Sequence, residues 1–218
     1  MKEVRILLAD DHEVVRKGVR LLIEKVPGWT VCGEAGTGRQ ALVLAEELNP
    51  DVVVLDINMP DLNGLDAIRQ IKRANSKIET LVFTGIENEK LVHDVFEAGA
   101  RSYILKSDIS SHLVSAIEAV AQHKTYFTTK ISEIVFARYL QGKSRPISDV
   151  EPGSRLTPRE REIVQLLAEG KSNKQVAANL GISVKTAETH RAAIMRKLGF
   201  EAFSELIRYA IRNHIIEA

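Results

Sequence analysis

The 218-residue sequence contains a single cysteine, Cys32, which cannot cross-link the chain on its own. Chains without disulfides are typical of a reducing compartment, so we expect a cytoplasmic protein. No apolar run approaches the roughly 20 residues that a helix needs to cross a bilayer, and no apolar segment typical of a secretory signal peptide appears near the start. These absences exclude a small disulfide-stapled fold and predict a protein that has no membrane partner.

The charge is nearly balanced overall but is unevenly distributed along the chain. Residues 1–124 carry 15 Lys and Arg against 19 Asp and Glu, a net −4, whereas residues 125–218 carry 15 against 10, a net +5. Hydrophobic residues make up 44% and charged residues 27%, as in ordinary globular proteins. The length favours one to two domains. An acidic first part and a basic second part fit a metal site joined to a region that binds a polyanion.

Residues 1–122 alternate short apolar runs with segments of helical periodicity. This alternation predicts an α/β domain with a five-stranded, parallel, doubly wound sheet and helices on both faces. The middle run, 51–56, is apolar almost throughout, as a strand buried on both faces should be. The predicted strands are 4–9, 29–35, 51–56, 79–84 and 102–105, and the predicted helices are 12–26, 38–48, 64–74, 88–98 and 110–122.

Residues 123–153 are predicted to be a linker with a helix over 125–140, because glycine, proline and polar residues dominate 141–154. The remaining domain, 154–218, shows no strand pattern. Its helix-start signals are two capping boxes and a serine cap, at Thr157 with Glu160, Ser172 with Gln175, and Ser183. We expect a small all-α domain of four helices, the third reaching about Leu198 and the fourth covering 202–215.

Polar residues stand at the ends of four of the predicted strands: Asp10 and Asp11, Asp56, Thr84, and Lys106. Because ligands of an open parallel sheet bind beyond the carboxyl ends of its strands, these side chains should converge. Three carboxylates repel one another unless a cation neutralises them, and an all-oxygen set of donors suits Mg²⁺. The neighbouring lysine and hydroxyl indicate that an anionic group also binds. The pattern therefore predicts a pocket for a metal ion and a phosphoryl group.

With these motifs, residues 1–122 resemble a response-regulator receiver domain, which has a flavodoxin-like fold. The motifs are Asp10-Asp11, Asp56-Ile57-Asn58-Met59-Pro60 followed by Gly64, then Thr84, and Lys106 after Tyr103.

The resemblance implies that Asp56 accepts a phosphoryl group from a sensor histidine kinase. It also implies that Asp11, Asp56 and the Asn58 carbonyl hold Mg²⁺, with Asp10 acting through water. Lys106 and the cation would offset the charge that develops during transfer. Thr84 and Tyr103 would form a switch that responds to phosphorylation.

Residues 154–217 resemble the LuxR/FixJ-type helix-turn-helix domain. The motifs are Leu156-Thr157-Pro158-Arg159-Glu160, Ser172-Asn173-Lys174, Ser183-Val184-Lys185-Thr186 with His190, and Lys197-Leu198-Gly199. The resemblance implies binding to double-stranded promoter DNA.

Helical geometry divides residues 183–198 into two faces. One face should pack inward and the other should fit the major groove, which admits one α-helix. The inward residues are Val184, Ala187, Ile194 and Leu198, and the outward residues are Lys185, Glu188, Thr189, Ala192 and Arg196. Lys185 and Arg196 suit phosphate contacts. Glu188 can accept a hydrogen bond from cytosine, and Thr189 and Ala192 can contact bases or a thymine methyl group.

The leading interpretation is a two-component transcriptional regulator that is phosphorylated at Asp56 and binds DNA as a homodimer. We expect no enzymatic activity beyond self-catalysed phosphotransfer and dephosphorylation. One alternative is an aspartyl-phosphate phosphatase, since Asp56-x-Asn58 loosely resembles an Asp-x-Asp nucleophile motif, but the second aspartate and a cap domain are missing. Another is a regulator that uses its first domain only for oligomerisation, against which the complete acidic set argues.

Overall fold

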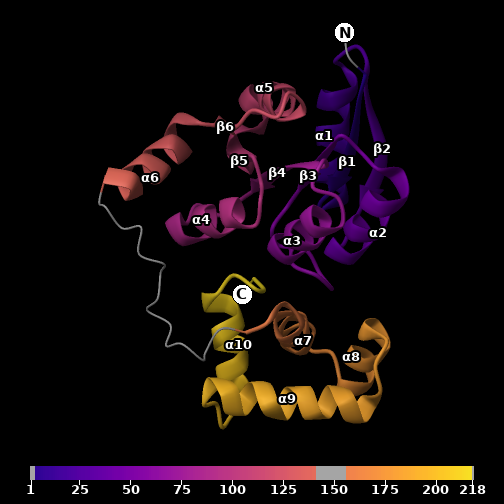
Figure 1. Cartoon of the computed structure of the whole chain (residues 1–218), viewed down its shortest axis with the longest axis vertical. Helices are drawn as coiled ribbons and strands as arrows, with labels where there is room; N and C mark the ends of the chain where they lie inside the picture. The colour runs from indigo at the N-terminus through magenta and orange to yellow at the C-terminus, as the bar shows by residue number, and fades with distance from the viewer. Residues whose placement is uncertain (1–2, 141–155, 218) are drawn as a thin grey trace. The chain divides into compact units, whose positions relative to one another are not determined.

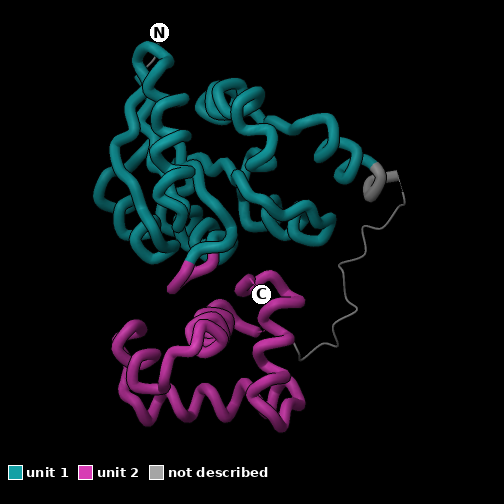
Figure 2. Tube along the Cα trace, turned by 180° about the vertical axis from the view of Figure 1, so that it is seen from behind, with its two compact units in different colours: residues 1–59, 64–143 teal, residues 60–63, 144–218 magenta. Residues whose placement is uncertain are grey.

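The computed structural model describes residues 3–140 and 156–217 (Figure 1). The chain divides into two compact units, which Figure 2 distinguishes by colour. The first unit comprises residues 1–59 and 64–143, and the second comprises residues 60–63 and 144–218. The predicted linker segment at 141–154 lies outside the described residues. Within the part of the chain that the structure describes, no helix is long and apolar enough to cross a membrane.

The first unit is built on one parallel sheet with the strand order β2-β1-β3-β4-β5-β6. Because β1 pairs with β3 as well as with β2, the winding direction reverses between β1 and β3, where a crevice forms in folds of this kind. β3 is buried along its whole length, as its apolar sequence predicts. The strands are β1 (Val4–Ala9), β2 (Trp29–Ala35), β3 (Val52–Leu55), β4 (Glu79–Thr84), β5 (Ser102–Leu105) and β6 (Tyr126–Phe127).

The prediction of five strands is wrong, because β6 adds a sixth strand at the edge beside β5. Two residues are too short to show a strand period, and the pairing depends on distant partners. The Tyr126 amide donates to the Arg101 carbonyl (3.2 Å), and the Ser102 hydroxyl donates to the Tyr126 carbonyl (2.9 Å). The helix predicted over 125–140 therefore begins only at Thr129.

Helices cover both faces of the sheet (Figure 1). On one face, Val19 and Ile23 of α1 and Leu113 and Ile117 of α5 join a single buried cluster with strand residues, while α2, α3 and α4 lie on the other face. The helices are α1 (Glu13–Glu24), α2 (Gly38–Leu48), α3 (Gly64–Ala74), α4 (Glu89–Glu97), α5 (Ile109–Ala121) and α6 (Thr129–Leu140), with a short 3₁₀ turn, η1 (Lys106–Asp108). The five helices predicted before residue 122 are confirmed.

The second unit contains four helices in residues 156–217 and no strand there, as predicted. They are α7 (Pro158–Ala168), α8 (Asn173–Leu180), α9 (Val184–Leu198) and α10 (Phe203–Arg212). Both predicted capping boxes are present, and the Ser183 hydroxyl accepts from the Thr186 amide. Gly181 has a φ of 64°, a left-handed conformation that glycine adopts without steric cost and that turns the chain from α8 into α9. Apolar residues of all four helices form one core.

Candidate functional site

The structure brings three of the predicted site residues together at the carboxyl ends of the strands. The Lys106 ammonium nitrogen lies 2.7 Å from a carboxylate oxygen of Asp10 and 2.7 Å from one of Asp56. These residues follow β5, β1 and β3, respectively. Asp10 and Asp56 are buried, and so is Thr84 at the end of β4. The Lys106 side chain is 23% exposed, so this charge cluster opens to solvent on the lysine side.

Burial and charge act in opposite directions on these groups. Burial raises the pKa of Asp56, and the nearby Asp10 raises it further, although Lys106 and a hydrogen bond from Thr84 oppose the change. Burial alone would lower the pKa of Lys106, but its two carboxylate partners outweigh burial and raise it. Two buried carboxylates thus share one cation, which leaves excess negative charge that favours a further cation.

Asp11 and His12 extend this acidic cluster toward solvent. Asp10, Asp11 and His12 offer ligand atoms that lie within 4.8 Å of one another. The His12 Nδ1 atom lies 2.6 Å from a carboxylate oxygen of Asp11, although the His12 side chain is 62% exposed. His12 was not among the predicted site residues, and its position directly after the acidic pair is the only sequence signal for it.

The donor atoms around this cluster fit a hard divalent cation. Carboxylate oxygens of Asp10 and Asp11 belong to the group of candidate ligands, and Mg²⁺ prefers such oxygens. Asp56 directs one oxygen at Lys106 and accepts a hydrogen bond from the Ile57 amide at the other (2.7 Å). Asn58, the remaining predicted ligand, is half-buried two residues further along.

Gly64 supports the Asp56 backbone in a way that the sequence motif did not explain. It is the first residue of α3, and its amide donates to the Ile57 carbonyl (2.8 Å). A Cβ atom at this position would lie 2.0 Å from the Asp56 carbonyl oxygen, far inside contact distance. Only glycine therefore permits α3 to begin this close to the loop that carries Asp56.

The predicted switch residues Thr84 and Tyr103 meet at the backbone of Ile86. Tyr103 is fully buried, and its hydroxyl donates to the Ile86 carbonyl. The Ile86 amide makes a long hydrogen bond to the Thr84 hydroxyl (3.4 Å). Burial raises the pKa of Tyr103, so its hydroxyl keeps its proton and acts as a donor at neutral pH. Ile86 lies in the loop that leads into α4, so both switch residues are attached to that loop.

In the second unit, α9 presents the predicted outward face. All five residues of this face are exposed: Lys185, Glu188, Thr189, Ala192 and Arg196. On the opposite face Ala187 and Ile194 are buried as predicted, and Leu198 is half-buried. The prediction for Val184 is wrong, since it is 42% exposed. It is the first residue of α9 and lies outside the domain core, although Ala187 in the same turn belongs to that core.

Two contacts that hold α9 in place were not predicted. The Lys197 ammonium group lies 2.7 Å from the Glu160 carboxylate, which also accepts from the Thr157 amide at the start of α7. The Arg191 guanidinium lies 4.9 Å from the ring centroid of Phe203 on α10. Lys197 and Arg191 therefore have structural partners. Within residues 3–140 and 156–217, Lys185 and Arg196 form no ion pair.

Comparisons with known proteins match both units. The model of the response regulator receiver domain matches residues 6–118, and that of the bacterial regulatory proteins of the luxR family matches residues 154–210. The transcriptional regulatory protein LiaR of Bacillus subtilis is 37% identical over 98% of this chain and 99% of its own length.

Solved structures of related regulators resemble the chain as well. A LuxR-family two-component response regulator from Aurantimonas sp. SI85-9A1 has a TM-score of 0.61 and 35% identity over 64% of this chain and 99% of that chain. The two-component response regulator RcsB in complex with DNA has a TM-score of 0.59 and 25% identity, covering 95% and 98% of the two chains. The chain belongs to the LuxR family of response regulators, in which a receiver domain precedes a LuxR-type DNA-binding domain.

Proposed function

We propose that Asp56 is the phosphoacceptor and that its phosphorylation by a sensor histidine kinase controls dimerisation and promoter binding. The observation that carries this proposal is the single Lys106 cation held between the buried carboxylates of Asp10 and Asp56. An Asp56 oxygen attacks the phosphorus, the P–N bond of the phosphohistidine breaks as the P–O bond forms, and a proton restores the neutral imidazole. Lys106 lies where it can offset the negative charge on the transferred group.

The same residues provide a place for Mg²⁺. Asp11, Asp56 and the Asn58 carbonyl would hold the ion, with Asp10 acting through water. When bound, the cation supplies positive charge for the phosphoryl oxygens and relieves the repulsion between the carboxylates. The family of the chain is one of regulators, and we propose that its chemistry is limited to self-catalysed phosphotransfer and dephosphorylation at Asp56.

Thr84 and Tyr103 form the proposed switch. A phosphoryl group on Asp56 would attract the Thr84 hydroxyl, whose present acceptor role toward the Ile86 amide would then be lost. Because Tyr103 donates to the carbonyl of the same residue, the loop before α4 would change with it. The differential affinity of the phosphoryl group for the two arrangements sets how far the equilibrium shifts.

For the second unit, we propose that α9 enters the major groove of promoter DNA. Lys185 and Arg196 would contact phosphates, and Glu188, Thr189 and Ala192 would contact base edges. Support comes from the exposure of all five residues and from the likeness to RcsB, whose structure is a DNA complex. A homodimer would place two such helices on two half-sites. Such a regulator acts on the chromosome, so we place it in the cytoplasm.

We propose domain boundaries at 1–122 for the receiver domain, 123–153 for the linker and 154–218 for the DNA-binding domain. The matched ranges 6–118 and 154–210 support them.

A phosphate-affinity gel tests the phosphoacceptor. The protein is incubated with acetyl phosphate and Mg²⁺, and a retarded band is expected for the parent protein. The band should be absent for Asp56→Asn, which keeps the shape but lacks the attacking carboxylate, and Asp11→Ala should need more Mg²⁺. Undiminished labelling of the Asn variant would refute the assignment. DNA footprinting with and without acetyl phosphate then tests control of DNA binding.

A further inference from the structure

The first unit has an apolar groove that the proposed function does not use. It lies between α4 and α6 and is closed at the base by β6, with a volume of about 480 Å³. Figure 1 shows β6 leading directly into α6, which lies near α4. Its large apolar lining residues are Val92 and Phe96 of α4, Phe127 of β6, and Ile134 and Val135 of α6. We call it the α4–α6 groove.

The groove has a rigid aromatic base and an exposed apolar edge. The rings of Phe96 and Phe127 meet edge to face with centroids 5.0 Å apart, which fixes the base. Val135 is 37% exposed, and Phe136, the next residue of α6, is 60% exposed. Exposed bulky apolar side chains beside an apolar groove favour binding of another apolar surface.

The charged residues of the described groove lining have one sign. Glu89 and Glu97 of α4 line it and are both exposed, whereas no lysine or arginine lines it among the side chains that the structure describes, those of 3–136 and 156–217. The nearby Lys130 of α6 is paired with Glu87 (2.5 Å), and His93 lies 3.4 Å from Glu97. A ligand that fills the groove would therefore gain from positive charge at its flanks.

This charge pattern argues against a second copy of the same groove as the occupant. In a symmetric dimer the same patch is used by both copies, so the acidic groove of one copy would meet the acidic groove of the other, with no lysine or arginine among the described lining residues to pair with Glu89 and Glu97. Like charges placed opposite each other weaken an interface.

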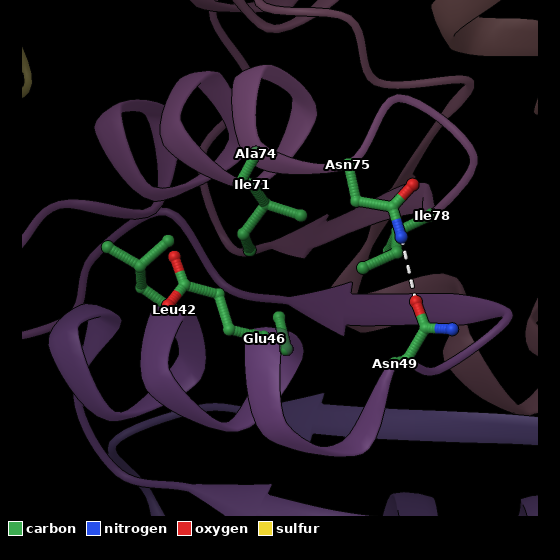
Figure 3. A pocket seen from close by; sticks show the side chains of 8 residues that line it. Leu42, Glu46, Asn49, Ile71, Ala74, Asn75 and Ile78 are labelled. Carbon is green, nitrogen blue, oxygen red and sulfur yellow. Dashed lines mark hydrogen bonds between the residues drawn. The ribbon is translucent and has the colours of Figure 1, made fainter.

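Another cavity in the first unit lacks these features. It lies between α2 and α3, has a volume of about 320 Å³ and is lined by Leu42, Glu46 and Ile71, among others (Figure 3). The side-chain amide of Asn75 donates to Asn49 (2.7 Å) across one end of it, as the dashed line in Figure 3 shows. The cavity is smaller and bridged by a polar pair, and its lining does not combine an aromatic base with charges of one sign.

We propose that the α4–α6 groove binds a helical segment of a partner protein that carries bulky apolar side chains on one face and Lys or Arg beside them. A groove between two helices suits an amphipathic helix, whose apolar residues recur on one face. The apolar face would cover Val135 and the Phe96–Phe127 base, and the flanking cations would pair with Glu89 and Glu97. The lining of this partner site shares no residue with the proposed phosphorylation site or with the outward face of α9.

Two synthetic helical peptides test the proposal with the full-length protein. Both carry the same leucine stripe and a fluorescent label, and one has lysines and the other glutamates beside the stripe. Fluorescence anisotropy should show that the lysine peptide binds about tenfold or more tightly than the glutamate peptide. Replacing both Glu89→Lys and Glu97→Lys should reverse this preference, which a merely apolar attraction would not do.

Matched valine variants locate the binding. Val135→Glu should weaken binding of the lysine peptide by about tenfold, whereas Val114→Glu should leave it unchanged, because Val114 is equally exposed (39%) but lies on α5 outside the groove. If Val135→Glu lowers the melting temperature, its weaker peptide binding could result from partial unfolding. The reversal of peptide preference by Glu89→Lys with Glu97→Lys then decides whether the groove is the binding site, because both positions are exposed. Equal affinity for the two peptides, or no reversal, would overturn the proposal. Self-association that Val135→Glu abolishes in sedimentation would instead identify a second copy as the occupant.

Discussion

The two candidate sites of this chain hold their charges in opposite ways. In the receiver domain, Asp10, Asp56 and Lys106 directly follow three different strands, and the Lys106 ammonium lies within hydrogen-bonding distance of both carboxylates. In the DNA-binding domain, the five candidate contact residues come from one helix, α9, and all are exposed. In the first arrangement the charged groups are largely buried and contact one another, so replacing one of them changes the environment of the others. In the second arrangement the side chains are exposed to solvent and can contact a binding partner. Substitutions should therefore change stability at the first site and only binding at the second.

The largest effect is expected at Gly64. A Gly64→Ala change places a methyl group 2.0 Å from the Asp56 carbonyl oxygen, so α3 and the loop before it must separate. We expect a loss of roughly 3 kcal/mol in the free energy of unfolding, in the range of overpacked cores. Urea denaturation measures it.

Gly85→Ala is the matched control, because a Cβ atom at Gly85 meets nothing within 4 Å. Its effect should stay within about 0.5 kcal/mol. Equal losses for the two variants would contradict the close contact at Gly64.

At the DNA-binding surface, changes should act on affinity without affecting folding. Glu188→Ala or Thr189→Ala should alter which base is preferred, at a cost of about 1–3 kcal/mol for a good contact. Lys185→Ala should weaken binding to all sequences and reduce the salt slope by roughly one phosphate contact. Binding to a randomised half-site at several salt concentrations separates the two classes. An unchanged base preference in the Glu188 and Thr189 variants would mean that this face does not lie in the major groove.

The buried carboxylate of Asp56 should oppose folding at neutral pH. Burial raises the pKa of Asp56 in the folded state, so the folded protein binds this proton more tightly than the unfolded chain does. Protonation of Asp56 therefore contributes to the free energy of unfolding at low pH, and this contribution is lost as pH rises through the folded-state pKa. Asp56→Asn leaves Lys106 with Asp10 as a single balanced pair and should therefore increase stability near pH 7.

Thermal or urea unfolding as a function of pH checks this prediction. The gain should shrink as pH falls and vanish below the ordinary pKa of aspartic acid, where the carboxyl group is protonated in both the folded and the unfolded state. A gain that did not vary with pH would exclude the titration of Asp56 as its cause.

The smallest effect is expected at the ion pair that joins α7 to α9. Lys197→Met should lower stability by less than about 1 kcal/mol, because the pair lies near the surface. In the parent protein burial alone would raise the pKa of Glu160, but the ion pair with Lys197 and the hydrogen bonds with Thr157 outweigh burial and lower it. The contribution of Glu160 is thus present above its unfolded-state pKa and is lost as pH falls through the lower folded-state pKa. Denaturation of Lys197→Met at low and high salt measures the pair, and a loss independent of salt would indicate packing of the lysine stem instead.

The sequence predicted those parts of the fold and site that local patterns determine. The ends of the apolar runs indicate Asp10, Asp56 and Lys106, and the helical periodicity with the capping residues indicates the helices. Each of these signals lies within a few residues of the feature that it predicts. Contacts between distant positions left no such pattern. Glu160 and Lys197 are 37 residues apart, β6 depends on its pairing with β5, and the close approach of Gly64 to Asp56 requires the folded backbone. Val184 was misplaced because helical periodicity predicts which face of α9 is inward but not how deeply each residue on that face is buried: Ala187 is buried and Val184 is exposed.

The backbone contacts of Ile86 limit how the proposed switch can vary in evolution. Thr84 and Tyr103 are linked through the amide and the carbonyl of Ile86, and its side chain takes no part in either bond. Any residue with a free amide can preserve this link, whereas proline cannot, because it has no N–H to donate. Selection can therefore change the side chain at this position while the backbone link between Thr84 and Tyr103 is kept.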